Sequence, residues 1–492
     1  MNKNQERIII FFILFFFGLI YSSISLVNHY QFRTSALDLG FNTHALHCYA
    51  HLINPRFMAK PEINYLGNHF TPLIFLFIPL YYIFGSYTLL VIQILAVLGG
   101  GLGIYFHSRL KTKYTWLPVI ILFQFYSLWG IYSALAYDFH FVVIAAMLVP
   151  WFIYFYETNN KKLTFLFLVL IILCKENMAL WMVFIITGLY AKDHFRNFKT
   201  QPFYSGSLLL IAGVYFMLVV GIIMPAINKG TVPIYFKNSY AHIGQSFSDI
   251  VVNLITHPKN TFELFFKNIY PDKPYNGIKS ELYLVILASG GLALLFKPHY
   301  LIMLIPVFTQ KMLSKDPLLW GTLYHYSIEF VPIITLALFD AVNSFNNRKI
   351  SYSIAVLFMI LTPLTSLRLM DHRKSLWYDP VTMQFYSKKH YDSSLNYKEI
   401  HRALKMIPDD AGVSAHQSIA PHIANREKLY HYPIMKDAEY IVLFQSKRGS
   451  YPVKKDKYAE QVIEYKNSEE FDIIYDDNDL LIIKILNLPI DQ

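Results

Sequence analysis

The chain has 492 residues, of which 54% are hydrophobic, 17% are aromatic and only 15% are charged, a composition that excludes a soluble globular protein and is typical of one with many membrane spans. The formal net charge of +10 does not indicate nucleic-acid binding, because residues 395–492 carry 13 Lys and Arg against 16 Asp and Glu. The basic excess therefore lies in the membrane part, where short basic loops set orientation.

Eleven apolar runs are predicted to span the membrane. A span needs about 20 residues, so the shorter runs must recruit flanking aromatic or polar residues. The first run follows Lys3 and Arg7 and lacks a small-residue cleavage site, which favours an uncleaved span over a signal peptide. The runs cover residues 8–27, 88–106, 115–133, 141–156, 163–174, 178–191, 204–225, 281–296, 299–309, 328–342 and 351–368.

A twelfth apolar run, 70–84, is short and contains Pro72 and Pro79, which is typical of a re-entrant or interfacial segment. If this run does not cross, the N-terminus and all the basic loops lie in the cytoplasm, as the positive-inside rule requires. If it crosses, those loops lie outside. We therefore predict an α-helical polytopic membrane protein with about 11 spans plus one juxtamembrane or re-entrant helix. The basic loops are Arg109/Lys111/Lys113, Lys161/Lys162, Lys192/Arg196/Lys199, Lys297 and Arg348/Lys349.

This topology predicts a transmembrane domain over residues 1–368, a linker over 369–394 and a small α/β domain outside the membrane over 395–492. The transmembrane domain includes a first external loop with juxtamembrane helices, 28–87, and a long external loop, 226–280. The tail alternates between helical patterns and short apolar strands, which indicates an α/β fold. The expected helices cover 397–407 and 457–465, and the expected strands cover 413–415, 440–444, 471–475 and 480–485.

Five groups of ionisable or histidine-containing residues are predicted to lie at the outer ends of the spans. Ionisable residues at span ends are costly and tend to mark function. Because the groups come from distant parts of the sequence, their meeting on one face predicts a single site at the membrane surface. The groups are Asp38-Leu39-Gly40, Asn68-His69-Phe70, Tyr137-Asp138-Phe139-His140, Lys175-Glu176-Asn177 and Tyr324-His325-Tyr326.

Two of these groups contain aspartates. Asp38 lies in the first external loop, where a carboxylate could take a proton from an acceptor hydroxyl or hold a divalent cation; helix capping together with Ser35 is the alternative. Asp138 and His140 are two residues apart, so in an extended segment both side chains can point the same way. This spacing fits a metal pair or an Asp–His hydrogen bond, and a solvated turn that caps the next helix is the alternative.

The remaining groups supply a cation and imidazoles. Lys175 and Glu176 stand between two apolar runs with almost no loop, so Lys175 could bind a phosphate as a point charge while Glu176 orients it. A structural ion pair is the alternative. His69, at the start of the run 70–84, could bind a phosphate or a metal or anchor the interface, and His325 precedes a span among aromatic residues of the kind found in membrane belts.

Together with Pro421-His422-Ile423-Ala424-Asn425-Arg426 in the tail, these motifs resemble a bacterial membrane-protein family catalogued only as a domain of unknown function. The resemblance runs from about residue 30 to about residue 430. That family is similar to the GT-C superfamily of polytopic glycosyltransferases, which includes dolichyl- and polyprenyl-phosphate-sugar-dependent mannosyl- and arabinosyltransferases. The chain departs from the family pattern at Asn177, where members more often have Asp.

The resemblance implies an inverting transfer of a sugar from a polyprenyl-phosphate donor to a glycan, lipid or protein acceptor at the outer face of the bacterial cytoplasmic (inner) membrane. It implies a catalytic acid in the first external loop, the place that Asp38 occupies. Tyr240 and His242 are then expected to cover the site as part of a lid, and His422 is expected to face it from the C-terminal domain. The expected donor-binding residues are His69, Asp138, His140, Lys175, Glu176 and His325.

A divalent cation such as Mg²⁺ or Mn²⁺ stays open as a cofactor, with Asp38, Asp138 and His140 as its candidate ligands. Two other functions are alternatives. A transporter or lipid flippase predicts ionisable residues at the bilayer midplane and repeat symmetry, and the sequence shows neither. A non-catalytic scaffold or receptor predicts that replacing Asp38 or Lys175 affects folding only.

Overall fold

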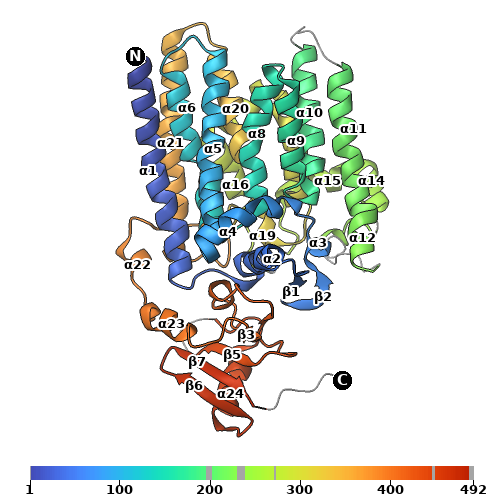
Figure 1. The fold of residues 1–492 in the computed structure, drawn as a ribbon. Coiled ribbons are helices and arrows are strands. Elements are labelled where there is room, and N and C mark those ends of the chain that lie inside the picture. The colour runs from blue at the N-terminus through green and yellow to red at the C-terminus, as the bar shows by residue number, and fades with distance from the viewer. Residues whose placement is uncertain are drawn as a thin grey trace.

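The computed structural model describes residues 2–195, 202–229, 239–245, 247–270, 273–445 and 449–486. Long helices stand side by side in a bundle, and a small sheet lies beyond one end of it, opposite the end that holds the N-terminus (Figure 1). Each of the eleven apolar runs forms a helical segment. The helices of the bundle are α1 (Lys3–Tyr30), α5 (Thr88–Lys111), α6 (Leu117–Tyr126), α7 (Trp129–Leu135), α8 (Phe141–Glu157), α9 (Lys161–Ile172), α10 (Glu176–Phe195), α11 (Pro202–Leu218), α16 (Ile278–Ile286), α18 (Pro298–Met312), α20 (Phe330–Asn343) and α21 (Arg348–Asp371).

Some of these helices continue through short irregular segments. The chain outside the bundle also forms short helices. The continuations are π-helix η4 (Val219–Ile223) with α12 (Met224–Ile227) after α11, and π-helix η5 (Leu287–Gly291) with α17 (Ala293–Phe296) after α16. The short helices are π-helix η1 (Ala36–Gly40), α2 (Phe41–Ala50), α3 (Tyr65–Asn68), η2 (Pro72–Phe77), α4 (Ile78–Phe84), η3 (Gly85–Tyr87), α19 (Pro317–Trp320), η6 (Pro380–Thr382), α22 (Lys388–Tyr391), α23 (Tyr397–Leu404) and η7 (Ala420–His422).

The number of membrane crossings stays a prediction. Among the described residues, five helical segments are long and apolar enough to span a membrane by length and composition. These segments are Lys3–Tyr30, Pro72–Lys111, Leu117–Leu135, Pro202–Ile227 and Arg348–Asp371.

The run 70–84 does not continue straight into the next long helix. It forms η2 and α4, and Gly85, with φ of +53°, breaks the helical path before α5 begins at Thr88. A side chain disfavours this left-handed backbone, so glycine suits the bend. In Figure 1, α4 runs across the lower end of the bundle rather than along it, and whether it enters the membrane stays a prediction.

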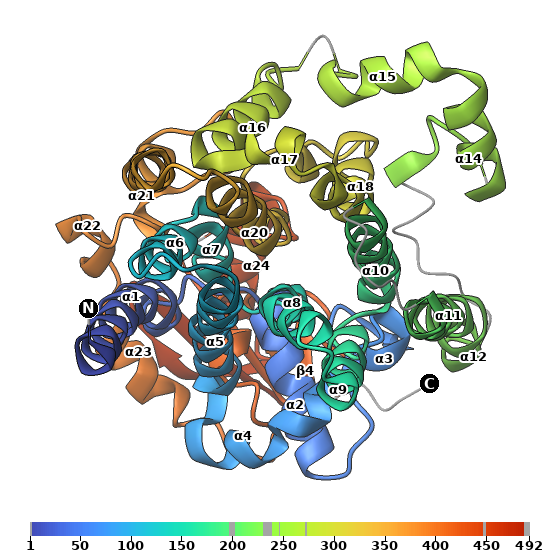
Figure 2. The ribbon, with the colours of Figure 1, turned by 90° about the horizontal axis from the view of Figure 1, so that it is seen from above.

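The long loop 226–280 contains two short amphipathic helices, α14 (Phe247–Thr256) and α15 (Pro258–Phe266). Figure 2, viewed along the bundle, shows both helices at its margin, beyond α11 and α18. Residues 230–238 of this loop lie outside the described part of the chain, as do Arg196 and Lys199 of the basic loop after α10.

A network of charges joins the helices at the end opposite the sheet. Lys192 of α10 lies 2.6 Å from a Glu157 oxygen of α8 and 3.2 Å from an Asp340 oxygen of α20. Lys111 of α5 also pairs with Glu157, and His107 Nε2 lies 2.9 Å from it. The sequence places Lys111 and Lys192 in basic loops and does not reveal their partners. The structure pairs both with carboxylates, because charged groups removed from water need partners.

The sheet after the bundle has the strand order β4-β3-β5-β7-β6. The expected strands and helices of the tail all form, within a few residues of their predicted ends, and β4 is an additional strand. β3 pairs in parallel with β4 and β5, and β7 pairs antiparallel with β5 and β6. The bounds are β3 (Val413–Ala415), β4 (Leu429–His431), β5 (Tyr440–Phe444), β6 (Phe471–Asp476) and β7 (Leu480–Ile485), with α24 (Lys455–Asn467) before β6.

Both faces of the central strands are buried, which explains why β5 is an unbroken apolar run. Val442 and Phe444 belong to the large hydrophobic cluster that continues into the bundle, whereas Ile441 and Leu443 pack in a second cluster with Tyr458 of α24. Alternate residues of a strand point to opposite faces. Burial of each such side chain contributes roughly 1.5–3 kcal/mol, so one face of the sheet is fixed against the rest of the protein.

The C-terminal part also contacts the first loop through backbone hydrogen bonds. Ala36 N donates to Gln417 O at 2.7 Å, and His431 N donates to Met58 O at 3.1 Å. Met58 lies between β1 (Arg56–Phe57) and β2 (Lys60–Asn64), a hairpin that the sequence did not predict. The first loop and the C-terminal sheet are thus held together at one end of the bundle.

Candidate functional site

Asp38 lies on the π-helix η1, directly after the end of α1. Its Oδ2 accepts a hydrogen bond from the Tyr137 hydroxyl at 2.9 Å, and His140 Nε2 lies 3.8 Å from its Oδ1. Ser35 caps this short helix, because its Oγ accepts from Leu37 N at 3.3 Å. The capping alternative therefore applies to Ser35, whereas the Asp38 side chain, 23% exposed, faces the residues before α8.

The surroundings of Asp38 change its acidity. Burial raises the pKa of the Asp38 carboxyl to about 6, against the hydrogen bond from Tyr137 and the positive charge of Lys175, which both lower it. A carboxylate with a pKa near neutrality is a stronger base than an exposed aspartate and is still ionised at pH 7. Asp38 is therefore suited to accept a proton.

The Asp138 carboxylate points at the backbone of η1. Its Oδ2 accepts from Ser35 N at 2.7 Å, and the side chain is 4% exposed. Burial and the nearby charge of Asp38 raise the pKa of Asp138 well above its usual range. This contact places Asp138 as a group that holds η1, and with it Asp38, rather than as one that faces a donor.

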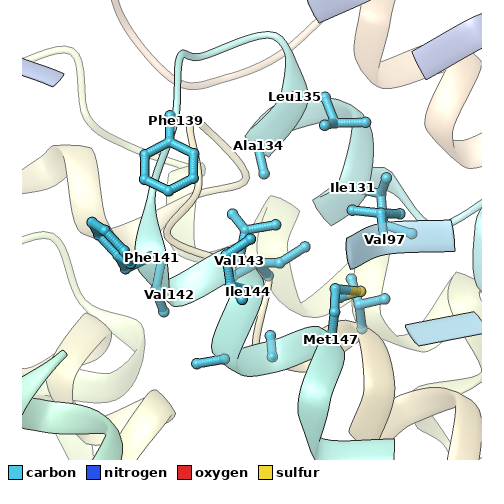
Figure 3. Packing of buried hydrophobic residues seen from close by; sticks show 14 of the residues in the cluster. Val97, Ile131, Ala134, Leu135, Phe139, Phe141, Val142, Val143, Ile144 and Met147 are labelled. Atoms are coloured by element: carbon cyan, nitrogen blue, oxygen red, sulfur yellow. The ribbon is translucent and has the colours of Figure 1, made fainter. Parts of the chain in front are cut away.

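The turn that carries Asp138 and His140 is held by Gln93 of α5. Gln93 Nε2 donates to Asp138 O at 2.8 Å, and Gln93 Oε1 accepts from His140 N at 2.9 Å. Asp138 has φ of +54°, so the turn is tight and depends on such support. Figure 3 shows the apolar packing around the turn, in which Phe139 lies near Phe141 at the start of α8.

His69 and Glu176 bind each other. His69 Nδ1 lies 2.9 Å from Glu176 Oε1, and Phe70 N donates to the other oxygen, Oε2, at 3.0 Å. Glu176 is the first residue of α10, so this contact ties the start of α10 to the segment before η2. The expectation that Glu176 orients Lys175 is not what the contacts show, because both carboxylate oxygens are bound by the His69-Phe70 segment.

Lys175 is the cation at the centre of the site. Within the described part of the chain, its ammonium group forms no hydrogen bond or ion pair shorter than 4 Å. Its charge nevertheless acts on Asp38, His140 and His325. Lys175 is half-buried, and an ammonium in this position is available to an anionic ligand.

The segment 321–329 forms a wall of rings beside these residues. The His325 ring stacks on His140 with centroids 3.5 Å apart, and the Tyr324 ring stacks on Tyr137 at 3.7 Å. Burial, Lys175 and His69 lower the pKa of His140 well below the usual range, and burial, His140 and Lys175 do the same for His325. The imidazoles are therefore neutral near pH 7. His140 Nε2 and His325 Nδ1 are buried atoms without a hydrogen-bond partner.

The three expected lid and acceptor residues contact groups other than Asp38. Tyr240 donates from its hydroxyl to Gln310 O at 2.9 Å near the end of α18, and His242 is influenced by Lys315 and Lys279. Neither residue contacts Asp38 among the described interactions. His422 stacks on His29 with centroids 4.2 Å apart, at the junction between α1 and the C-terminal part.

The turn next to His422 does reach the site. A Cβ added at Gly40 would lie 3.3 Å from Pro421, so η7 packs directly against the π-helix that carries Asp38. The motif in the tail thus supports the position of η1 from outside the bundle.

The candidate metal ligands do not converge. Within the described residues, no group of three or more His, Cys, Asp or Glu side chains could hold a metal ion. Asp138 faces the Ser35 amide, which leaves Asp38 and His140 as a pair. The donor set of the three candidates does not fit a bound Mg²⁺ or Mn²⁺, which prefers several oxygen ligands.

Several residues of the site were not singled out from the sequence. Gln93 lies in a long apolar run, and its polarity there is the only sequence signal. Tyr137 and Tyr324 stand within predicted motifs but were given no role there, because aromatic residues at span ends are common. Lys311 of α18 donates to Tyr326 O at 2.8 Å and to Gly321 O and Ser327 Oγ at 3.1 Å, so it fixes the segment 321–329.

Comparisons with solved structures identify the fold. ArnT from Cupriavidus metallidurans bound to undecaprenyl phosphate, a GT-C glycosyltransferase, is similar over 100% of both chains, with 11% identity and a TM-score of 0.54. The Archaeoglobus fulgidus oligosaccharyltransferase, solved with a tethered acceptor peptide containing the NVT sequon, matches at a TM-score of 0.39 and 13% identity, over 92% of this chain and 68% of that one. The likeness to ArnT shows that this chain shares the fold of that protein.

Comparisons of sequence identify the family. No curated protein matches the chain. The family described as "Predicted membrane protein (DUF2079)" matches residues 28–482, which includes all five motifs and the C-terminal sheet almost to its last residue. The resemblance drawn from the motifs is confirmed, and the chain belongs to this DUF2079 family of membrane proteins.

Proposed function

We propose that the protein is a glycosyltransferase of the bacterial cytoplasmic membrane, which transfers a sugar from a polyprenyl-phosphate donor to an acceptor hydroxyl or amide at the outer face. In this proposal the N-terminus is cytoplasmic, and the C-terminal α/β part, residues 395–492, lies outside the membrane. Asp38 is the general base, and Lys175 binds the phosphate of the donor.

One observation carries the proposal: the charge of a lysine that pairs with no described group acts on a carboxylate that can serve as a base. The Asp38 carboxylate is held by Tyr137 at 2.9 Å, and the ammonium of Lys175 influences it without pairing with it. A transfer from a phosphate carrier needs both groups, one to remove the acceptor proton and one to stabilise the departing phosphate.

The reaction would proceed by a single displacement. The Asp38 carboxylate takes the proton of the acceptor as the acceptor atom attacks the anomeric carbon. The bond between that carbon and the phosphate oxygen breaks, the electron pair leaves with the polyprenyl phosphate, and the configuration inverts. Lys175 offsets the charge that develops on the phosphate, and the neutral imidazoles of His140 and His325 can donate hydrogen bonds to it.

The fold and the place of the site support a lipid-linked donor. The site lies where loops from α1, α7, α9 and α18 meet at one end of an apolar bundle, so a headgroup can reach it while its chain stays in the membrane. ArnT, which shares the fold, was solved with undecaprenyl phosphate. We infer that this chain binds a carrier of the same class.

The direct test is carrier binding by purified protein in lipid nanodiscs. We expect undecaprenyl phosphate to bind the wild type, and Lys175→Met to weaken binding about 10–100-fold, because a hydrogen bond to a charged group contributes roughly 1.5–3 kcal/mol. Lys162→Met, an exposed lysine at the start of α9, is the matched control and should bind as wild type. Equal affinity of wild type and Lys175→Met would contradict the proposed role of Lys175.

A further inference from the structure

Glu329 is a carboxylate that no motif of the site includes, although it closes the segment 321–329. It is the residue before α20, and its side chain does not cap that helix. The segment is held by Lys311, which donates to three oxygens within it, and by Arg373, which donates to Thr322 O at 2.8 Å. The segment that carries Glu329 is therefore held through its backbone.

The Glu329 carboxylate is buried and incompletely bonded. The residue is 8% exposed, and its Oε2 is a buried atom without a hydrogen-bond partner. Within the described residues it forms no ion pair, although the charges of Lys311 and Lys175 both act on it. An unsatisfied buried polar group destabilises the fold, and more so when it is charged, so a carboxylate in this state is expected to serve a ligand.

The neighbours of Glu329 place it at the proposed site. Lys175, which acts on Glu329, also acts on Asp38. His325, four positions before Glu329, stacks on His140, which lies 3.8 Å from Asp38. Glu329 and Asp38 are thus both within reach of the Lys175 charge, although one precedes α20 and the other follows α1.

The surrounding charges limit what Glu329 can bind. Two ammonium groups and the N-terminal end of α20 already supply positive potential, so a cationic ligand has little to gain there. A phosphate would be repelled by the carboxylate and attracted by Lys175 instead. Sugar hydroxyls are neutral donors, and carboxylates accept hydrogen bonds from them at short range.

We propose that Glu329 binds hydroxyl groups of the sugar carried by the lipid donor and so determines which sugar is accepted. The inference rests on the proposed function, because it assigns the sugar end of the same donor whose phosphate Lys175 binds. It separates two tasks within one site: Lys175 recognises the carrier phosphate, and Glu329 recognises the sugar.

The test compares affinities for bare undecaprenyl phosphate and for undecaprenyl phosphate that carries glucose, mannose or arabinose. We expect at least one glycosylated lipid to bind the wild type more tightly than the bare lipid. Glu329→Ala should remove most of that gain, a loss of about 10-fold, and should keep the affinity for the bare lipid within about twofold. Glu329→Gln, which can still accept a hydrogen bond, should lose less.

The control is Glu263→Gln, an exposed carboxylate on α15 paired with Lys267, and thermal unfolding of each variant verifies its fold. A Glu329→Ala protein that keeps the full gain from the sugar would overturn the inference. So would equal losses for bare and glycosylated lipid, or a wild type that binds the bare lipid without any gain from a sugar. If the wild type does not bind the bare lipid at all, the proposed function fails, and the inference fails with it.

Discussion

The imidazole rings of His140 and His325 stack with their centroids 3.5 Å apart and their planes 26° from parallel. The contact joins the turn before α8 to the segment before α20, and the Tyr137–Tyr324 stack lies beside it. Tyr137 also donates to Asp38. The aromatic wall therefore fixes the two side chains, Tyr137 and His140, that surround the proposed base.

Transfer activity should fall on the acid side of neutrality. Burial raises the pKa of Asp38 to about 6, and a protonated carboxyl cannot accept the acceptor proton. Below about pH 6, kcat/KM should fall about tenfold per pH unit. The histidines do not produce this limb, because the pKa values of His140 and His325 lie well below the usual range. A profile measured between about pH 5 and pH 8 that stays flat would contradict the assignment.

Tyr137→Phe should move the fall of kcat/KM on the acid side to higher pH. The substitution removes the hydrogen bond to Asp38 that lowers the carboxyl pKa, so the carboxylate is protonated more readily. The measurement is the same pH profile on the variant. Tyr132→Phe on α7 is the control, since the Tyr132 ring makes an edge-to-face contact with Tyr21 of α1, and its profile should overlay the wild type. An unshifted limb in Tyr137→Phe would show that the hydrogen bond does not tune the base.

Gln93→Leu should reduce kcat more than it changes KM, because it frees the turn that carries Asp138 and His140. Loss of two buried hydrogen bonds also costs about 2–4 kcal/mol of stability. Gln124→Leu is a matched control: Gln124 is equally buried and bonds to Ser289 and Thr335 within the bundle. Both variants should unfold at lower temperature. If kcat falls equally in both, Gln93 acts through general stability and not through the turn.

The charge network at the opposite end of the bundle should matter for stability and not for chemistry. Lys192→Met leaves Glu157 and Asp340 short of a partner, and breaking a buried pair by removing one member costs about 3–5 kcal/mol. The thermal unfolding temperature in nanodiscs should fall clearly, whereas the protein that stays folded should keep the wild-type kcat. Lys162→Met, which is exposed, should unfold like wild type. A loss of kcat in folded Lys192→Met would link this network to the site.

Much of the bundle follows from hydropathy, because a spanning segment must satisfy its backbone groups by helical hydrogen bonds and must be apolar over the thickness of the lipid. The meeting of Asp38 with the Tyr137–His140 turn also follows, since both flank spans at the same end. The short strands β1, β2 and β4 do not follow, because two to five residues hold too little periodicity.

Roles within the site were harder to predict than its location. Asp138 and Asp38 are both aspartates at predicted span ends, yet in the structure the Asp138 carboxylate accepts a hydrogen bond from the Ser35 amide. Gln93 and Lys311 stand alone in apolar helices, and nothing in the sequence tells which backbone groups they bind. Glu176 follows Lys175 directly but pairs with His69. These outcomes depend on tertiary contacts between distant segments, which local patterns do not record.

The most direct measurement is donor consumption by wild type and Asp38→Asn in lipid, with a panel of radiolabelled polyprenyl-phosphate sugars. Asn keeps the shape of Asp38 and can still contact Tyr137, so both proteins should fold and bind carrier alike. Loss of a general base costs about 100-fold to 10,000-fold in rate. We expect the wild type to consume a donor and release polyprenyl phosphate, and Asp38→Asn to do neither measurably. Equal consumption by both proteins, or by neither, would contradict a transferase that uses Asp38 as its base.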